Sequence, residues 1–107
     1  MVGDGIMTNQ FVLIRHDDRK MDELEELPDG EYDTIHEAIG GYITYMPKVY
    51  LPSKLPWRNK SRRLLNVILD EEGEMKNLPF NQRATLMLGG AYPILGDAIL
   101  EIGEVVE

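Results

Sequence analysis

The sequence predicts one small α+β domain over residues 1–107, with a mostly antiparallel sheet of about four or five strands and two short helices. Its length is near the commonest size of a single domain and too short for two independent cores. Hydrophobic residues make up 43% of the chain, which is enough to offset the entropy lost on folding. Short apolar runs rich in strand formers alternate with turn residues and brief helical patterns, which is typical of this fold class. We expect residues 1–9 to be flexible.

The first expected elements are a strand and a short helical segment. Residues 11–14 form an apolar run whose length suits a strand better than a helix. Residues 21–27 carry apolar side chains at three-residue spacing, which predicts one or two helical turns. Pro28 and Gly30 then predict a turn.

A capping box marks the next expected helix. Thr34 and Glu37 have the required spacing, in which the threonine oxygen accepts a hydrogen bond from a free amide and the glutamate reaches back. Gly40 and Gly41 are residues of the kind that end helices. We therefore expect a helix over residues 35 to about 39.

Two expected strands flank a long excursion in the middle of the chain. Residues 42–50 alternate and favour a strand, in which Pro47 predicts a bulge or a sheet edge. Residues 64–69 form the next strand. The intervening residues 51–63 contain two prolines, so they predict a long exposed excursion rather than a tight hairpin.

The last expected elements are a second short helix over residues 80–88 and a strand over residues 98–102. The turn residues 70–73 separate this helix from the strand before it. The apolar side chains of the expected elements predict the core. The predicted core residues are Phe11, Leu13, Ile35, Ile39, Ile43, Tyr45, Leu65, Val67, Leu69, Leu86, Leu88, Ile99 and Ile102.

Charge and composition exclude several classes of protein. A net charge of -8 disfavours broad, non-specific binding to nucleic acids or membrane surfaces, because both repel an acidic protein. The chain has no cysteine, which excludes disulfides and thiolate metal sites and favours a reducing compartment. It shows no secretory leader pattern and no apolar run near the roughly 18 residues of a membrane span. These features predict a cytoplasmic protein without membrane contact.

No set of residues in the sequence meets the demands of catalysis. Both serines lie in the excursion without a neighbouring histidine, and nucleophilic catalysis needs such a base. His16, Asp17 and Asp18 are consecutive, so their side chains would point to opposite faces of an extended chain rather than hold one metal ion. We therefore predict no catalytic residue, no metal site and no cofactor.

The sharpest functional signal is a basic patch on this acidic protein. Five of the eleven basic residues fall within ten positions, beside the only tryptophan. The indole ring can stack on a base, and the cations can donate to phosphate or carboxylate oxygens. The predicted ligand-binding residues are Trp57, Arg58, Lys60, Arg62, Arg63, Asn81 and Arg83. The alternatives are a solvated loop that partly neutralises the acidic segment 17–33, or contact of the loop with an acidic partner or with the acidic segment of a second copy in a homo-oligomer.

Four short motifs follow the apolar first strand. They are Ile-Gly-Gly-Tyr-Ile at 39–43, Asp-Glu-Glu-Gly at 70–73, Leu-Pro-Phe-Asn-Gln-Arg-Ala-Thr at 78–85 and Gly-Asp-Ala at 96–98. In this order they resemble an uncharacterised family, domain of unknown function 3846. Members of that family come from phages, plasmids and the bacteria that carry them, so the resemblance implies a mobile-element accessory protein and assigns no reaction. The excursion 51–63 is longer than in the family, so the resemblance implies no role for it.

These observations lead to one hypothesis and two alternatives. The hypothesis is a non-catalytic binding protein of a phage or other mobile element, which acts against host defence by sequestering a small anionic, nucleotide-like ligand or by occupying a host protein. A small hydrolase or nuclease is the alternative from the enzyme class. An acidic DNA mimic is the further alternative, although nine carboxylates in one segment fall short of duplex DNA, which carries a charge every ~1.7 Å.

Overall fold

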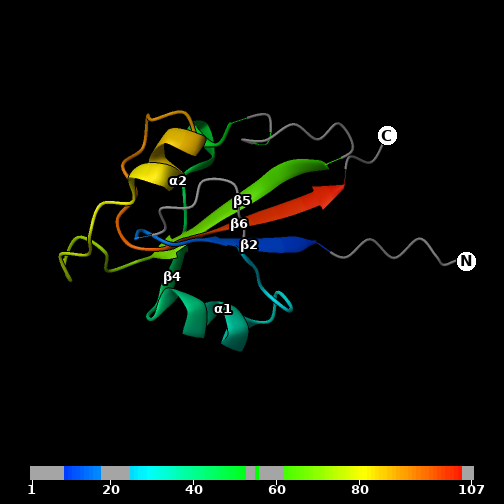
Figure 1. Ribbon diagram of the computed structural model, residues 1–107, viewed down its shortest axis with the longest axis horizontal. Coiled ribbons are helices and arrows are strands. Elements are labelled where there is room, and N and C mark those ends of the chain that lie inside the picture. The colour runs from blue at the N-terminus through cyan, green and yellow to red at the C-terminus, as the bar shows by residue number, and fades with distance from the viewer. Residues whose placement is uncertain (1–8, 18–24, 53–54, 56–61, 105–107) are drawn as a thin grey trace, which may run out of the picture.

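A computed structural model of the chain describes residues 9–17, 25–52, 55 and 62–104. Its centre is a five-stranded antiparallel sheet with the strand order β3-β2-β6-β5-β4. Helix α1 (Tyr32–Ile39) lies on one face of the sheet and helix α2 (Gln82–Met87) on the other (Figure 1). The predicted α+β fold with a mostly antiparallel sheet and two short helices is confirmed.

The five strands differ in length and in how deeply they are buried. Their bounds are Gln10–Ile14 for β2, Glu25–Glu26 for β3, Ile43–Tyr45 for β4, Arg62–Asp70 for β5 and Ala98–Glu104 for β6. Strand β6 lies in the centre, between β2 and β5. Its consecutive residues Ala98, Ile99 and Leu100 are all fully buried, because the sheet is covered on both faces at this strand.

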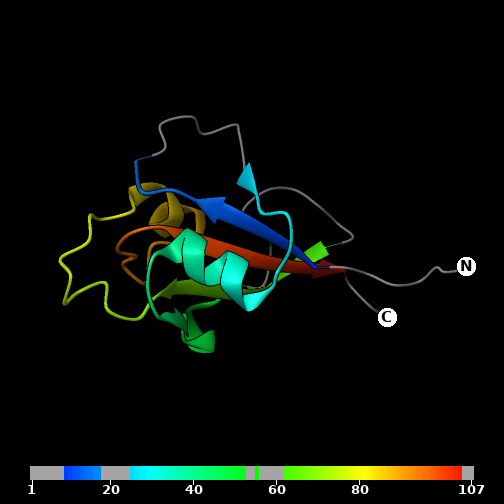
Figure 2. The same cartoon turned by 90° about the horizontal axis from the view of Figure 1, so that it is seen from below.

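Two hydrophobic cores lie on opposite sides of the sheet. The core on the α1 side is small, and Figure 2 shows α1 crossing in front of β6, which it contacts. Its buried members are Leu13, Ile35, Ile39, Ile68 and Ile99. The core on the α2 side is larger and takes the alternate residues of the same strands, including Val12, Val67 and Leu100. This division follows from the period of two along a strand.

Most predicted core residues are buried, but two are exposed to solvent. Leu86 is 63% exposed and Tyr45 is 54% exposed. Leu86 lies two positions from both Ala84 and Leu88, which belong to the α2-side core, so it points to the opposite side of the helix. Tyr45 ends the edge strand β4. The prediction also missed buried residues in loops, such as Met46 and Ile94.

The segment 21–27 was expected to be helical, and its described part is not. Residues 25 and 26 form strand β3, which pairs antiparallel with Val12 and Leu13 of β2. Residues 21–24 lie outside the described residues. The expectation failed over residues 25–26 because pairing with a distant strand overrides a weak local helical pattern.

Helix α1 begins three residues earlier than the capping box predicts. Its N-cap is Glu31, and no side chain caps it. Thr34 instead lies within the first turn, where its side chain forms a hydrogen bond with Asp29, and the backbone amide of Glu31 donates to the same carboxylate at 3.0 Å. The predicted end of the helix is confirmed, because Gly40 takes the left-handed conformation with φ 84°.

The Thr34 contact yields a test of this helix start. The hydrogen bond from Thr34 and the amide of Glu31 hold the pKa of Asp29 below its ordinary value. Thr34→Ala is expected to raise that pKa, which NMR titration of the carboxyl group measures, while Thr44→Ala serves as the control. Because the folded-state pKa is depressed, the contribution of Asp29 to stability is present above its unfolded pKa and is lost as the pH falls through the folded value. An unchanged pKa in Thr34→Ala would contradict the role of the threonine.

The middle of the chain has less strand than expected. Only Ile43–Tyr45 of the expected strand 42–50 is extended, at the edge of the sheet, and Lys48–Tyr50 forms a short 3-10 helix after Pro47. Strand β5 begins at Arg62, so it takes the last two residues of the expected excursion. Leu51 and Leu55 pack against the α2-side core.

Within the ranges given above, no helix is long and apolar enough to cross a membrane.

Candidate functional site

The structure separates the predicted ligand-binding residues that it describes. Trp57, Arg58 and Lys60 lie outside the described residues. Arg62 and Arg63 are neighbours on β5. The Nη1 atom of Arg62 lies 3.4 Å from Oε1 of Glu104 on β6, whereas Arg63 is exposed. Arg63 is thus the described basic residue of the patch that faces solvent.

Asn81 is fully buried and organises the fold around itself. Its Nδ2 atom donates to the backbone oxygens of Ile14 and Gly96, each at 2.9 Å. Its Oδ1 atom accepts from the amide of Ala84 at 2.9 Å, which caps α2. Arg83 follows on α2 and is only 5% exposed. Both residues thus lie inside the fold, and they do not share a surface with Arg63.

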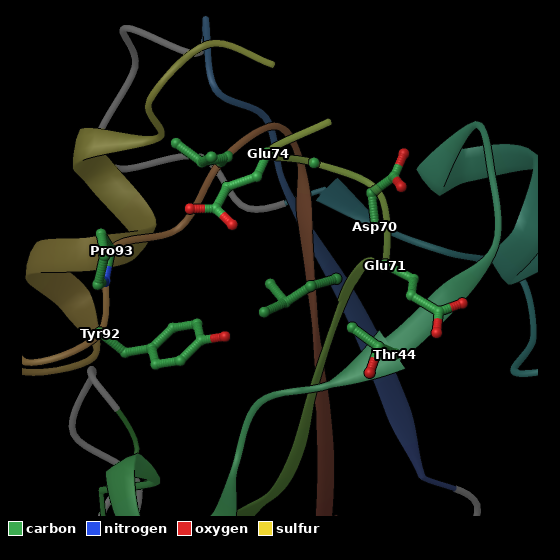
Figure 3. Close-up of a pocket in the computed structure, with 9 residues that line it drawn as sticks. Thr44, Asp70, Glu71, Glu74, Tyr92 and Pro93 are labelled. Atoms are coloured by element: carbon green, nitrogen blue, oxygen red, sulfur yellow. The ribbon is translucent and has the colours of Figure 1, made fainter. Parts of the chain in front are cut away.

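A cleft on the α2 side of the sheet is a better candidate for a binding site. Its volume is about 460 Å³, and it lies between the β4–β5 pair and the loop before β6 (Figure 3). The lining residues are Thr44, Leu69, Asp70, Glu71, Gly73, Glu74, Tyr92, Pro93 and Leu95. Figure 3 shows the carboxylate of Glu74 and the ring of Tyr92 approaching the cleft from different segments. The cleft thus has apolar walls, one aromatic ring and an acidic rim.

The acidic residues at the rim differ in whether their carboxylates are hydrogen-bonded within the protein. The side chain of Asp70 is 2% exposed, and it accepts hydrogen bonds from Lys76 Nζ at 2.9 Å and from the amide of Glu72 at 2.8 Å. The bond to Asp70 raises the pKa of Lys76. By contrast, the carboxylates of Glu71 and Glu74 form no hydrogen bond or ion pair with any described residue. Two carboxylates at the rim are therefore open to a cation.

The rings beside the cleft are held by their neighbours. Tyr50, from the short 3-10 helix, packs against Tyr92 with ring centroids 5.2 Å apart. Tyr92 is half-buried and also packs against the α2-side core. This support fixes the aromatic wall before any ligand arrives, which lowers the entropy lost on binding.

A histidine and an aspartate form a second polar feature. Nδ1 of His16 lies 2.9 Å from Oδ1 of Asp97, and the same oxygen accepts from the backbone amide of His16 at 2.9 Å. Such a pair can orient an imidazole as a general base. Neither residue lines the cleft described above or the cleft of about 480 Å³ beside Phe11 and Gly30. The described ranges also contain no group of three residues able to hold a metal ion.

The sequence contains only part of the signal for the cleft. The acidic run at 70–74 follows the longest strand, but it reads as a turn, and nothing local connects it to Tyr92. No family model, curated protein or solved structure matches the chain. The likeness to the family of unknown function therefore stays a prediction.

Proposed function

We propose that this chain is a non-catalytic binding protein whose acidic cleft receives a positively charged side chain of a partner protein. The observation that carries the proposal is that two carboxylates, Glu71 and Glu74, line a cleft with apolar walls and are bonded to no described residue. A lysine or arginine stem can lie along such a wall while its charged end reaches the rim. No described lysine or arginine lines this cleft, so it suits a cation better than an anion.

The acidic lining of the cleft supports one of the two partner classes that the sequence left open. A nucleotide-like ligand would bring its phosphates against Glu71 and Glu74, and like charges repel. The cleft therefore favours the protein partner. We propose a host protein in the cytoplasm, as the resemblance to proteins of mobile elements implies. Sequestration of an anion at the basic patch stays a prediction, since Trp57, Arg58 and Lys60 lie outside the described residues.

NMR titration of the full chain with small probes tests this function. The probes are N-acetyl-lysine amide and N-acetyl-arginine amide as cations, and adenosine monophosphate as the anion. We expect the cations to shift the resonances of Thr44, Leu69 and Tyr92. Glu71→Gln and Glu74→Gln should each weaken this binding by a factor between about 1.4 and 5, because exposed ion pairs contribute ~0.2–1 kcal/mol.

A matched control removes one charge from the other end of the sheet. Glu26 lies on β3, the edge strand opposite β4, and accepts a hydrogen bond from Gln10 that a glutamine can also accept. Glu26→Gln should leave the binding of both cations unchanged. Resonances of the cleft that stay fixed with both cations would overturn the proposal. Binding of the nucleotide that is lost in Trp57→Ala would support anion sequestration instead.

A hydrolase is the second candidate, because the His16–Asp97 pair is a specific observation that favours it. Asp97 holds Nδ1 of His16 at 2.9 Å, which leaves Nε2 as the atom that could accept a proton. The binding proposal has priority because neither described cleft includes the pair. Turnover of a phosphodiester that survives purification and disappears in His16→Asn would favour the hydrolase over the binding protein.

A further inference from the structure

A row of three aromatic rings runs along the exposed flank of α1 and past its end. Tyr32 stacks on His36 with ring centroids 5.5 Å apart and an angle of 28° between the rings. His36 meets Tyr42 edge-on, with centroids 6.4 Å apart. Tyr32 is 58% exposed and Tyr42 is 63% exposed. These three residues form the aromatic row.

The fold does not need the aromatic row for its core. Helix α1 is anchored to the sheet by Ile35 and Ile39, which are buried in the α1-side core. Tyrosine is enriched in the buried centres of protein interfaces, where it supplies a large rigid contact area. Two exposed tyrosines joined by a histidine therefore mark this flank as an interaction surface.

The charges around the row determine which partner fits. Asp33 and Glu37 are spaced like Tyr32 and His36, one position further along, so they form a parallel acidic row on the helix. Residues 29–47, which contain α1 and both of its flanks, have four carboxylates and neither lysine nor arginine. Lys76 reaches this end of the helix near Gly41, but its ammonium group is bound to Asp70. The surface is thus strongly negative as well as aromatic.

We propose that the aromatic row, with Asp33 and Glu37, binds an arginine-bearing segment of the partner protein. A planar guanidinium group can stack on an aromatic ring and donate two hydrogen bonds to a carboxylate at the same time. A lysine ammonium group is a more strongly hydrated point charge and does not combine the two contacts in this way. The row therefore distinguishes arginine from lysine, which the cleft does not.

The row and the cleft lie on opposite faces of the sheet, because α1 covers one face and the cleft opens on the α2 side. The backbone oxygen of Tyr42 accepts a hydrogen bond from the amide of Glu71 at 2.8 Å, and Glu71 lines the cleft. This bond joins the two segments at the β4–β5 edge of the sheet, but the row and the cleft are two separate sites. The identity of the partner rests on the proposed function, whereas arginine binding by the row does not.

Two matched peptides test the proposal on the full chain. Each is five residues long with blocked ends and alternating glycine, and carries either two arginines or two lysines. We expect the arginine peptide to shift the resonances of Tyr32, His36 and Tyr42 and to bind at least about threefold more tightly than the lysine peptide. Tyr32→Ala and Tyr42→Ala should each weaken it about two- to fivefold.

The controls separate the ring from its hydroxyl group and from exposed aromatic surface elsewhere. Tyr32→Phe keeps the ring and should keep the binding. Phe80 is 52% exposed and not part of the row, so Phe80→Ala should change nothing. Circular dichroism and urea denaturation of each variant show whether it retains the fold.

The outcomes distinguish this proposal from the proposed function. Equal affinity for the two peptides would contradict arginine binding by the aromatic row. Unchanged affinity in folded Tyr32→Ala and Tyr42→Ala would contradict it as well. Neither result would bear on cation binding by the cleft. Arginine-selective shifts on the row in Glu71→Gln and Glu74→Gln, without shifts in the cleft, would support the row alone. Sedimentation that shows a dimer dispersed by Tyr42→Ala would identify a second copy as the occupant and overturn the partner proposed here.

Discussion

Asn81→Ala is expected to lower the free energy of unfolding by about 3–5 kcal/mol, because it leaves three buried backbone groups without their partner. The amide of Ala84 loses its cap, and the oxygens of Ile14 and Gly96 lose their donor. Each buried polar group without a partner costs ~1–3 kcal/mol. Such a loss is a large part of the roughly 5–15 kcal/mol that stabilises a typical domain. Urea denaturation followed by circular dichroism measures it.

Gln82→Ala is the matched control for this substitution. Gln82 is the neighbouring residue on α2 and is exposed, so its replacement should change stability by no more than about 0.5 kcal/mol. If Asn81→Ala were as stable as the unchanged protein, the hydrogen bonds around Asn81 would not hold the fold. Asn81 would then be available for the ligand-binding role that the sequence predicts.

Ile99→Ala is expected to cost about 2–5 kcal/mol, and Ile99→Val about 0.5–1.5 kcal/mol. Ile99 is fully buried on the central strand, and it belongs to the small α1-side core of five residues. That core has few neighbouring side chains to close around a cavity, so the loss should lie toward the upper end. Thermal and urea denaturation of both variants measure the graded effect.

Leu86→Ala tests the converse expectation, that truncating an exposed apolar side chain costs little stability. The helical pattern in the sequence predicts Leu86 in the core, but the structure leaves it 63% exposed on α2. Its replacement should therefore change stability by no more than about 0.5 kcal/mol. A loss comparable to that of Ile99→Ala would mean that Leu86 is covered in solution, which would contradict the position of α2.

Elements whose signals are local were predictable from the sequence. The apolar runs at 11–14, 64–69 and 98–102 lie within β2, β5 and β6, because a strand buried on both faces needs consecutive apolar residues. Gly40 ends α1 as expected, because few other residues adopt its left-handed conformation readily.

Features that depend on distant contacts were not predictable. Strand β3 exists because β2 offers it an edge, and nothing in residues 25–26 themselves favours a strand. The start of α1 was missed for a local reason, because Thr34 bonds to Asp29 five positions earlier instead of capping the helix. The cleft is built from three separate segments, around Thr44, residues 69–74 and residues 92–95.

Asn81 is a different case, because its signal was present in the sequence. Asparagine is among the preferred N-cap residues, and Asn81 directly precedes α2. The sequence analysis predicts Asn81 as a ligand-binding residue, whereas the structure shows a side chain whose amide and carbonyl both bond to the backbone. An asparagine just before a helix is better tested first as a cap.

The central position of β6 also determines how the chain folds. Strand β6 pairs with β2, which lies more than eighty residues earlier, and with β5. Until β6 has been synthesised, the β2–β3 and β4–β5 pairs have no strand between them and each remains an isolated two-stranded unit, which is marginally stable at best. Pairing across such separations raises the contact order and slows folding. The nascent chain therefore leaves one edge of β2 and one edge of β5 unpaired until β6 is available, and the sheet gains its cooperative stability only when β6 pairs with both strands.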